Sequence, residues 1–328
     1  MLVSVVVFAY NRKSFILDAL NSVVSQSADK SCIEIILIKN FEDAKIDEFC
    51  KANNIKAIHF DGTVGQYIAR GIEESNGDII SFLDDDDQFC SNKIERLIEI
   101  YNSTQFDFLH NNYNEIDWKG DNRDLYMRKL HFTHYDFNMI VLDNIKNATS
   151  LKELIKVESD FNISCMSISA NLAKEIHNII KNVTACQDGF LFYFAIEYGK
   201  VIALGEKLTL YRVHESTSNV ISDYSQFRKN ACKDLKNQTQ SLMLLLSSMS
   251  HNVSKRSLGE FIALKQLKLK SLRCDGISIK PKKLIALLFS KSRFNLYTLI
   301  WLSLYILSTL FGTIVGRAIF RYTRSIFD

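Results

Sequence analysis

Four consecutive carboxylates follow directly on a run of apolar residues in the segment 77–89, GDIISFLDDDDQF. The apolar run is typical of a buried strand in a parallel sheet, because such strands are apolar on both faces. At a separation of roughly 5 Å and an effective dielectric constant of about 20, each pair of like charges costs on the order of 3 kcal/mol. Water or a divalent cation must therefore take up the charge of Asp84, Asp85, Asp86 and Asp87.

A solvated acidic loop is the alternative interpretation of these carboxylates. Their place after a strand favours a ligand site, since open α/β sheets bind ligands at the carboxyl ends of their strands. Mg²⁺ and Mn²⁺ suit such oxygens and usually complete their coordination with substrate phosphates. Asp84 and Asp86 could share a cation that acts as a Lewis acid toward a leaving diphosphate.

Other residues along the chain could serve the same chemistry. Asp188 precedes an aromatic run, FLFYF, where partial desolvation would raise its proton affinity and suit it to act as a general base. His214 is a candidate metal ligand or diphosphate contact, and Arg212 could pair with a phosphate. Tyr10 and Asn11 follow the first predicted strand, where a base or ribose would lie. The alternatives are a helix cap for Asp188, a structural role for His214, a surface ion pair for Arg212, and ordinary turn residues for Tyr10 and Asn11.

The order of the predicted elements explains how these residues could meet. Strands are predicted at residues 3–8, 34–38, 55–60, 79–83, 106–110, 162–169, 201–204 and 208–213. Segments with apolar residues at helical spacing lie between most of these strands, and one of them is a helix capped by Ser91. This alternation predicts an α/β fold with a Rossmann-like, mostly parallel sheet and helices on both faces. From residue 224 onward the pattern is helical.

The composition limits the class of protein. A length of 328 residues suffices for a catalytic domain with an appendage, and a net charge of +3 gives no reason to expect a nucleic acid partner. Gly62, Gly65 and Gly71 match neither a dinucleotide fingerprint nor a P-loop. Seven cysteines lack a paired framework and metal-binding spacing, so we expect reduced thiols and no disulfides. The opening MLVSVVVFAYNR is read as the first strand rather than a signal peptide.

The C-terminal region contains an uncharged run at residues 295–316. As a helix it would be roughly 33 Å long, about the thickness of the hydrocarbon layer, so we expect contact with a bilayer. Basic residues flank both ends, which opposes a simple span under the positive-inside rule. A span, an interfacial or re-entrant helix and a soluble core helix stay open. The predicted division is a catalytic domain at 1–219, a helical extension at 220–280 and a membrane-associating segment at 281–328.

Across about residues 3–219 the chain resembles inverting glycosyltransferases of the GT-A fold, family 2. The motifs that carry the resemblance occur in the family's order and are VSVVVFAYNR, GTVGQYIARGI, SFLDDDDQF, Gln187-Asp188 and YRVH at 211–214. The resemblance implies that Asp84 and Asp86 lie at the metal and nucleotide sugar and that Asp188 is the base. The segment Lys39-Asn40-Phe41 departs from the acidic residues with which the family commonly reads the nucleotide base, so Lys39 could instead meet a phosphate. Gln187 replaces the family's usual Glu.

The predicted site follows from these motifs. The expected metal ligands for Mg²⁺ or Mn²⁺ are Asp86, Asp84 and His214, and the catalytic base is Asp188. The expected nucleotide-sugar-binding residues are Ala9, Tyr10, Asn11, Lys39, Gly65, Arg70, Asp84, Asp85 and Arg212.

This site predicts an inverting glycosyltransferase at the cytoplasmic face of the cell membrane. It would transfer a sugar from a nucleotide-sugar donor to a glycan, a lipid-linked acceptor or another hydroxyl acceptor. The alternatives are a polyprenyl-phosphate glycosyl synthase and a catalytically silent binding or scaffold protein with the same fold.

Overall fold

The computed structural model describes residues 1–117, 137–143, 148–213, 223–274, 296–311, 314–315 and 317–318. The chain divides into two compact units, Met1–Val213 and His214–Asp328. The division into a catalytic domain, a helical extension and a membrane-associating segment stays a prediction.

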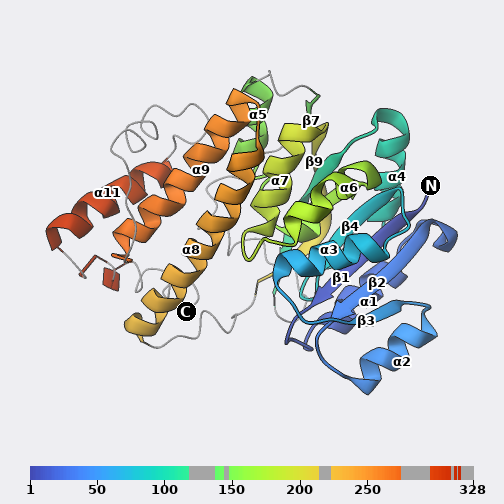
Figure 1. Ribbon diagram of the computed structural model, residues 1–328. Helices are drawn as coiled ribbons and strands as arrows, with labels where there is room; N and C mark the ends of the chain where they lie inside the picture. The colour runs from blue at the N-terminus through green and yellow to red at the C-terminus, as the bar shows by residue number, and fades with distance from the viewer. Residues whose placement is uncertain are drawn as a thin grey trace. The chain divides into compact units, whose positions relative to one another are not determined.

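The first unit is built on one sheet with the strand order β3-β2-β1-β4-β8-β6-β9-β5, and β7 also pairs with β9 (Figure 1). The strands are β1 (Val3–Ala9), β2 (Ile33–Lys39), β3 (Lys56–His59), β4 (Ile79–Asp84), β5 (Gln88–Phe89), β6 (Phe108–Ile116), β7 (Met139–Leu142), β8 (Met166–Ser169) and β9 (Val201–Arg212). Strands β1, β2, β3 and β4 pair in parallel, as does β6 with β9. Strand β8 is antiparallel to β4 and β6, and β9 is antiparallel to β5 and β7. The sheet is therefore mixed: its longest pairings are parallel, as predicted, and its shorter pairings, at β8, β5 and β7, are antiparallel.

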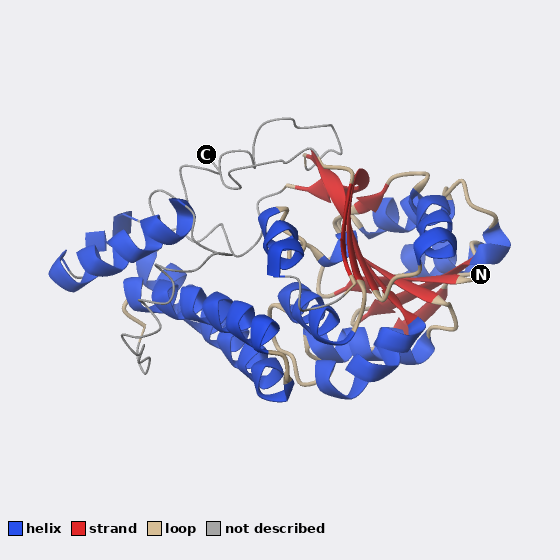
Figure 2. Cartoon of the chain, turned by 90° about the horizontal axis from the view of Figure 1, so that it is seen from above, coloured by secondary structure: helices blue, strands red, loops and turns tan. Residues whose placement is uncertain are grey.

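Helices cover both faces of this sheet, as predicted (Figure 2). They are α1 (Ile16–Val24), α2 (Ala44–Ala52), α3 (Val64–Glu74), α4 (Lys93–Thr104), α5 (Ala148–Lys156), α6 (Ala170–Ile180) and α7 (Gln187–Tyr198). Val5 and Val7 of β1 share a core with the apolar sides of α1, α2 and α4. Val6 points to the opposite face, where Gly71 of α3 lies against it, because successive strand residues alternate between faces.

Tertiary contacts change three of the predicted elements. The two strands predicted at 201–204 and 208–213 are one strand, because Gly205 keeps a hydrogen bond from its N–H to Asn138 O at 2.8 Å. The predicted strand at 162–169 begins as a 3₁₀ turn, η3 (Ile163–Cys165), because the Asn162 side chain accepts the N–H of Ser164. Helix α4 begins after Asn92 instead of Ser91, and the Gln26 side chain of a distant segment accepts the N–H of Ile94.

The second unit contains the helices α8 (Tyr224–Ser248), α9 (Asn252–Ser271) and α11 (Leu296–Phe311). Trp301, Leu302 and Tyr305 of α11 pack against Ala263, Leu264 and Leu267 of α9. A disulfide joins Cys232 of α8 to Cys274, with their Cα atoms 5.7 Å apart. The prediction that the chain has no disulfides is therefore wrong for this pair.

Helix α11 covers most of the uncharged run at 295–316 and has 16 residues. None of the helices in the described ranges combines the length and the hydropathy needed to cross a bilayer. The flanking segment 281–295 lies outside the described residues.

Candidate functional site

The four aspartates comprise the last residue of β4 and the turn that leads to β5, and we call residues 84–87 the acidic turn. It lies at the carboxyl ends of β1 and β4, since Phe8 is opposite Asp84 in their parallel register. Asp84 and Asp86 are partly exposed, whereas Asp85 and Asp87 are 3% and 2% exposed. The alternation leaves Asp84 and Asp86 accessible to an external ion and turns the other two inward.

Arg12, in the loop after β1, binds two of these carboxylates. Its Nε donates to Asp85 Oδ1 at 3.0 Å, its Nη2 also contacts that oxygen, and its Nη1 lies 2.7 Å from Asp86 Oδ2. Burial lowers the pKa of Arg12, but the hydrogen bond to Asp85 and the charges of the turn raise it above its usual value. The guanidinium is therefore a permanent positive charge beside the acidic turn.

Asp87 fixes the turn to two other elements. Its Oδ1 accepts the N–H of Arg212 at 2.9 Å, and its Oδ2 accepts Asn162 Nδ2 at 3.0 Å. Burial and the charge of Asp86 raise the pKa of Asp87 to about 7. Asp87 thus links the acidic turn to the end of β9 and to the η3 turn.

Arg212 is a buried support of the acidic turn and not a surface ion-pair residue. Its side chain is 2% exposed, and its Nε donates to the carbonyl of Asp86 at 2.8 Å. Its Nη2 contacts Asp18 Oδ2 at 3.1 Å, and its guanidinium carbon lies 4.5 Å from the centroid of the Phe15 ring.

The residues after β1 form an aromatic and amide surface at the same edge. Tyr10 is 55% exposed, and its ring meets the edge of Tyr67 with centroids 5.9 Å apart. Asn11 has a positive φ of 56°. Its N–H donates to Asn40 Oδ1 at 2.9 Å, and Asn40 Nδ2 donates back to Asn11 Oδ1 at 3.0 Å. The reciprocal pair joins the ends of β1 and β2 beside an exposed tyrosine ring.

Ala9 and Lys39, two of the predicted nucleotide-sugar contacts, lie opposite each other in the register of β1 and β2. Both are buried. Lys39 Nζ donates to the Phe41 carbonyl at 2.7 Å and pairs with Asp47 Oδ1 at 3.0 Å. Its ammonium therefore holds the loop between β2 and α2.

Gly65 and Arg70 lie on α3 and make contacts that stabilise the fold. The N–H of Gly65 donates to Val183 O at 3.1 Å, and a Cβ at Gly65 would stand 2.0 Å from Ile180 O. Arg70 pairs with Glu73 at 3.3 Å and with Glu74 on its own helix.

Asp188 lies in the first turn of α7, where its Oδ1 accepts the N–H of Gly189 at 2.8 Å. The residue that precedes the helix is Cys186, so Asp188 is not the N-cap. The side chain is partly exposed, whereas residues 190–196 behind it are buried. Because Val183 O accepts the N–H of Gly65, the loop that leads to Asp188 is fixed to the start of α3, the helix that follows β3.

The acidic turn has the charge and chemistry to hold a divalent cation. Partial burial, followed by the charges of Asp86, Asp87 and Asp85, raises the pKa of Asp84 well above its usual value, and a bound cation would offset these like charges. Asp85 Oδ2 is buried without a hydrogen-bond partner. Oxygens of this kind fit Mg²⁺ or Mn²⁺. Within the described ranges, however, no three carboxylate, imidazole or thiol groups surround one point, and His214 lies outside those ranges.

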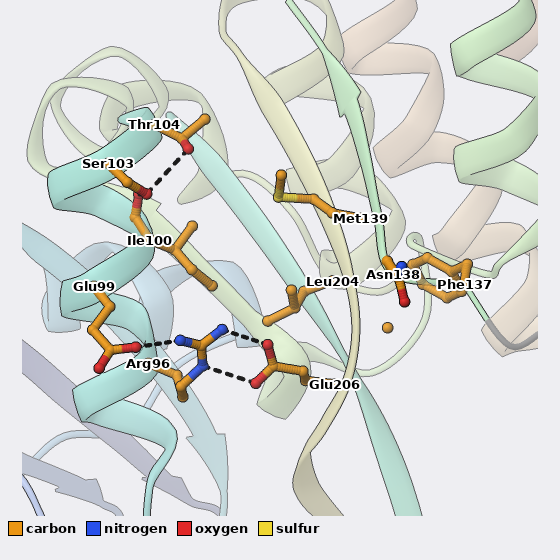
Figure 3. A pocket seen from close by; sticks show the side chains of 11 residues that line it. Arg96, Glu99, Ile100, Ser103, Thr104, Phe137, Asn138, Met139, Leu204 and Glu206 are labelled. Atoms are coloured by element: carbon orange, nitrogen blue, oxygen red, sulfur yellow. Dashed lines mark hydrogen bonds and ion pairs between the residues drawn. The ribbon is translucent and has the colours of Figure 1, made fainter.

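A separate hollow of about 670 Å³ lies between α4, the residues before β7 and the middle of β9 (Figure 3). Arg96 spans it by binding Glu99 and Glu206. No residue of the acidic turn lines this hollow.

Arg12, Lys93, Asn162 and Ser164 are parts of the site that the sequence did not predict. Arg12 directly follows the predicted pair Tyr10 and Asn11, so its charge was an available signal. Asn162 and Ser164 contact the acidic turn from a distant segment, and Lys93, six residues after the turn, donates a hydrogen bond to Ser164 O.

Residues 4–168 match the family described as Glycosyl transferase family 2. An uncharacterized glycosyltransferase of Rickettsia bellii is 33% identical over 123 residues, which are 36% of this chain and 18% of that protein. The glycosyltransferase AglE of Haloferax volcanii is 32% identical over 117 residues, which are 34% of this chain and 38% of that protein. The matched part of the chain spans 18% to 23% of the length of three Rickettsia relatives.

Solved structures share the fold at low sequence identity. Staphylococcus aureus TarS 1-349, crystallised with UDP, has a TM-score of 0.57 at 15% identity, covering 99% of this chain and 92% of that one. The mannosyltransferase PcManGT of Pyrobaculum calidifontis, crystallised with GDP-Man and Mn²⁺, has a TM-score of 0.55 at 9% identity, covering 99% and 83%. These likenesses confirm the expected fold as a GT-A-like α/β sheet followed by helices.

Proposed function

Because the chain belongs to glycosyl transferase family 2, we propose that it transfers a sugar from a nucleotide-sugar donor to a hydroxyl acceptor. The observation that carries this proposal is the acidic turn, with Asp84 and Asp86 partly exposed at the carboxyl ends of β1 and β4. The UDP-GlcNAc of one TarS structure and the GDP-Man and Mn²⁺ of PcManGT support a nucleotide-sugar donor and a divalent cation as parts of the same proposal.

In this proposal each residue at the sheet edge has a separate role. Asp84 and Asp86 would hold the cation, which would supply positive charge for the departing diphosphate. Arg12, already 2.7 Å from Asp86 Oδ2, adds a second positive charge beside it. The exposed ring of Tyr10 offers a surface on which the nucleoside base can stack.

Asp188 serves as the general base. Its carboxylate accepts the proton of the acceptor hydroxyl, whose oxygen forms a bond to the anomeric carbon on the face opposite the diphosphate. The bond from that carbon to the diphosphate oxygen breaks in the same step, and the configuration inverts. The product is a glycosidic bond and a nucleoside diphosphate.

The test measures release of nucleoside diphosphate from a panel of nucleotide sugars with Mn²⁺. Asp86→Ala and Asp188→Asn should each lower turnover at least about a hundredfold, because one removes a cation ligand and the other the base. Asp143→Asn, at an exposed aspartate after β7, is the matched control and should keep full turnover. Unchanged turnover in both site variants would end the proposal.

The same variants separate the alternatives. A polyprenyl-phosphate acceptor is already ionised and needs little base, so Asp188→Asn would then retain its activity. A silent scaffold would show no Mn²⁺-dependent binding of nucleoside diphosphates by calorimetry.

We also propose that α11 binds the cytoplasmic face of the cell membrane by lying in the lipid interface. Its exposed apolar residues recur at a spacing of seven, Leu299 with Ile306 and Ile300 with Leu307, so they share one side of the helix. The side that carries Trp301 packs on α9. Basic residues flank this part of the sequence and would favour anionic lipid.

Flotation with vesicles of anionic and zwitterionic lipid tests this second proposal. Binding should be stronger to anionic vesicles and should be lost in Ile306→Asp, whereas Met243→Asp, at an exposed apolar residue of α8, should still bind. Equal binding by both variants would contradict an interfacial α11.

A further inference from the structure

Lys93 is a completely buried lysine at the first position of α4. Burial removes its amino group from water, and the charged form also faces the positive end of the helix dipole. The amino group is nevertheless bound. Nζ donates to Ser164 O at 2.7 Å and to Thr209 Oγ1 at 3.1 Å, and it lies 3.8 Å from the centroid of the Phe89 ring.

The oxygens that receive these bonds belong to a closed network. Thr209 Oγ1 donates to Ser164 O at 3.1 Å and accepts Asn111 Nδ2 at 2.9 Å. The carbonyl of Ser164 therefore receives hydrogen bonds from both Lys93 and Thr209. The main chain at Ser164 is held from α4 and from β9 at once.

Ser164 in turn supports the acidic turn. Its Oγ accepts the N–H of Asp84 at 3.0 Å, and its side chain is hydrogen-bonded to Asp87. Its own N–H donates to Asn162 Oδ1 at 2.8 Å, and Asn162 binds Asp87 as described above. Phe89, under the Lys93 amino group, belongs to the strand that leaves the turn. Lys93 thus contacts the support of the acidic turn and its continuation.

We propose that Lys93 is a positioning residue for the acidic turn. By fixing Ser164 and Phe89, it sets the spacing of the two carboxylates that are proposed to hold the cation. The effect on cation affinity rests on the proposed function, whereas the effect on the backbone of the turn can be measured without it.

The test compares Lys93→Met with Lys174→Met, which removes an exposed lysine of α6. In Lys93→Met, calorimetry should show about tenfold weaker Mn²⁺-dependent binding of a nucleoside diphosphate, the loss expected for one buried hydrogen bond. Hydrogen–deuterium exchange at residues 84–89 should become faster, while exchange elsewhere stays as in the wild type. Lys174→Met should match the wild type in both measurements. If Lys93→Met does not fold, Thr209→Val replaces it in the test. This variant removes the second donor to Ser164 O and should shift both measurements in the same direction.

Three possible results test the positioning role of Lys93. Wild-type Mn²⁺ affinity and wild-type exchange at 84–89 in both site variants would overturn the proposal, even if their melting temperature fell. Faster exchange spread evenly over the first unit would also overturn it, since that result describes general destabilisation. Faster exchange confined to 84–89, with no Mn²⁺ binding by the wild type, would support the positioning of the turn and refute the proposed function instead.

Discussion

The four aspartates of the acidic turn differ in their surroundings. Asp85 and Asp87 are buried, and burial raises the pKa of Asp85 to about 6 and that of Asp87 to about 7. Asp84 and Asp86 are partly exposed. A buried carboxylate that accepts hydrogen bonds from two other elements contributes to the fold, whereas a partly exposed carboxylate among like charges is available to a cation.

Alanine substitutions should separate these two roles. Asp87→Ala should lower the free energy of unfolding by about 2–4 kcal/mol, because the buried N–H of Arg212 and the amide of Asn162 lose their acceptor. Asp86→Ala should change it by less than about 1 kcal/mol, because a partly exposed pair with Arg12 contributes little. Asp86→Ala should instead abolish Mn²⁺-dependent nucleotide binding. Urea unfolding and calorimetry measure the two quantities, and equal destabilisation by both substitutions would contradict the assignment.

Lys93 predicts a pH dependence of stability with a definite sign. Burial lowers its pKa from 10.5 to about 7, against the opposing charges of Cys165, Cys90 and Asp87. Between about pH 7 and 10.5 the unfolded chain therefore binds a proton that the folded chain has released, so this residue's contribution to the free energy of unfolding rises with pH. Lys93→Met lacks this pH-dependent contribution to the free energy of unfolding. Urea unfolding should show the stability of the wild type relative to Lys93→Met increasing from pH 7 to pH 9.5, and a constant difference would mean that Lys93 ionises normally.

At the scale of elements, apolar patterning was sufficient to predict β1, β2 and β4 and the position of the acidic turn. These strands lie inside the sheet and are covered on both faces, so their residues are mostly apolar. The pattern failed at Gly205, where a hydrogen bond to Asn138 continues a strand that the local sequence interrupts. Arg12 and Lys93 could not be assigned partners, because their hydrogen bonds join residues 73 and 71 positions apart.

Helix α3 supports the segment that carries the proposed base. Gly65 at its start donates its N–H to Val183, five residues before Asp188. The approach is close because Gly65 has no Cβ; an added Cβ would lie 2.0 Å from the Ile180 carbonyl and 2.6 Å from that of Val183. Both obstacles are backbone atoms, which cannot turn away as a side chain can.

Gly65→Ala should therefore destabilise the first unit by about 1–3 kcal/mol. It should also lower kcat more than it lowers Mn²⁺ affinity, because the displaced loop leads to Asp188 and not to the acidic turn. Gly259→Ala is the matched control: nothing lies within 4 Å of its added Cβ in the middle of α9, so it should stabilise its helix by about 0.5–1 kcal/mol. Thermal unfolding and steady-state kinetics measure these effects, and a stable, fully active Gly65→Ala would contradict the close packing.

At the scale of the whole molecule, the two units are stabilised by different means. The described site residues belong to Met1–Val213, which has a large apolar core around its sheet. In the second unit, the bond between Cys232 and Cys274 closes a stretch of 42 residues that includes α9. Arg228 reinforces the same junction by donating to Leu272 O at 2.8 Å.

Reduction of this disulfide should destabilise the second unit and leave the site unchanged. The chain-entropy estimate for a closed loop of this length is about 4 kcal/mol, so Cys232→Ser should lower the unfolding midpoint of the second unit. Mn²⁺-dependent nucleotide binding should stay at the wild-type value, because the proposed ligands lie in the other unit. Cys32→Ser, at a partly exposed cysteine that forms no disulfide, is the control for the substitution itself. Thiol titration of the oxidised, unfolded protein should find five of the seven cysteines reactive, and seven reactive thiols would show that Cys232 and Cys274 are not joined.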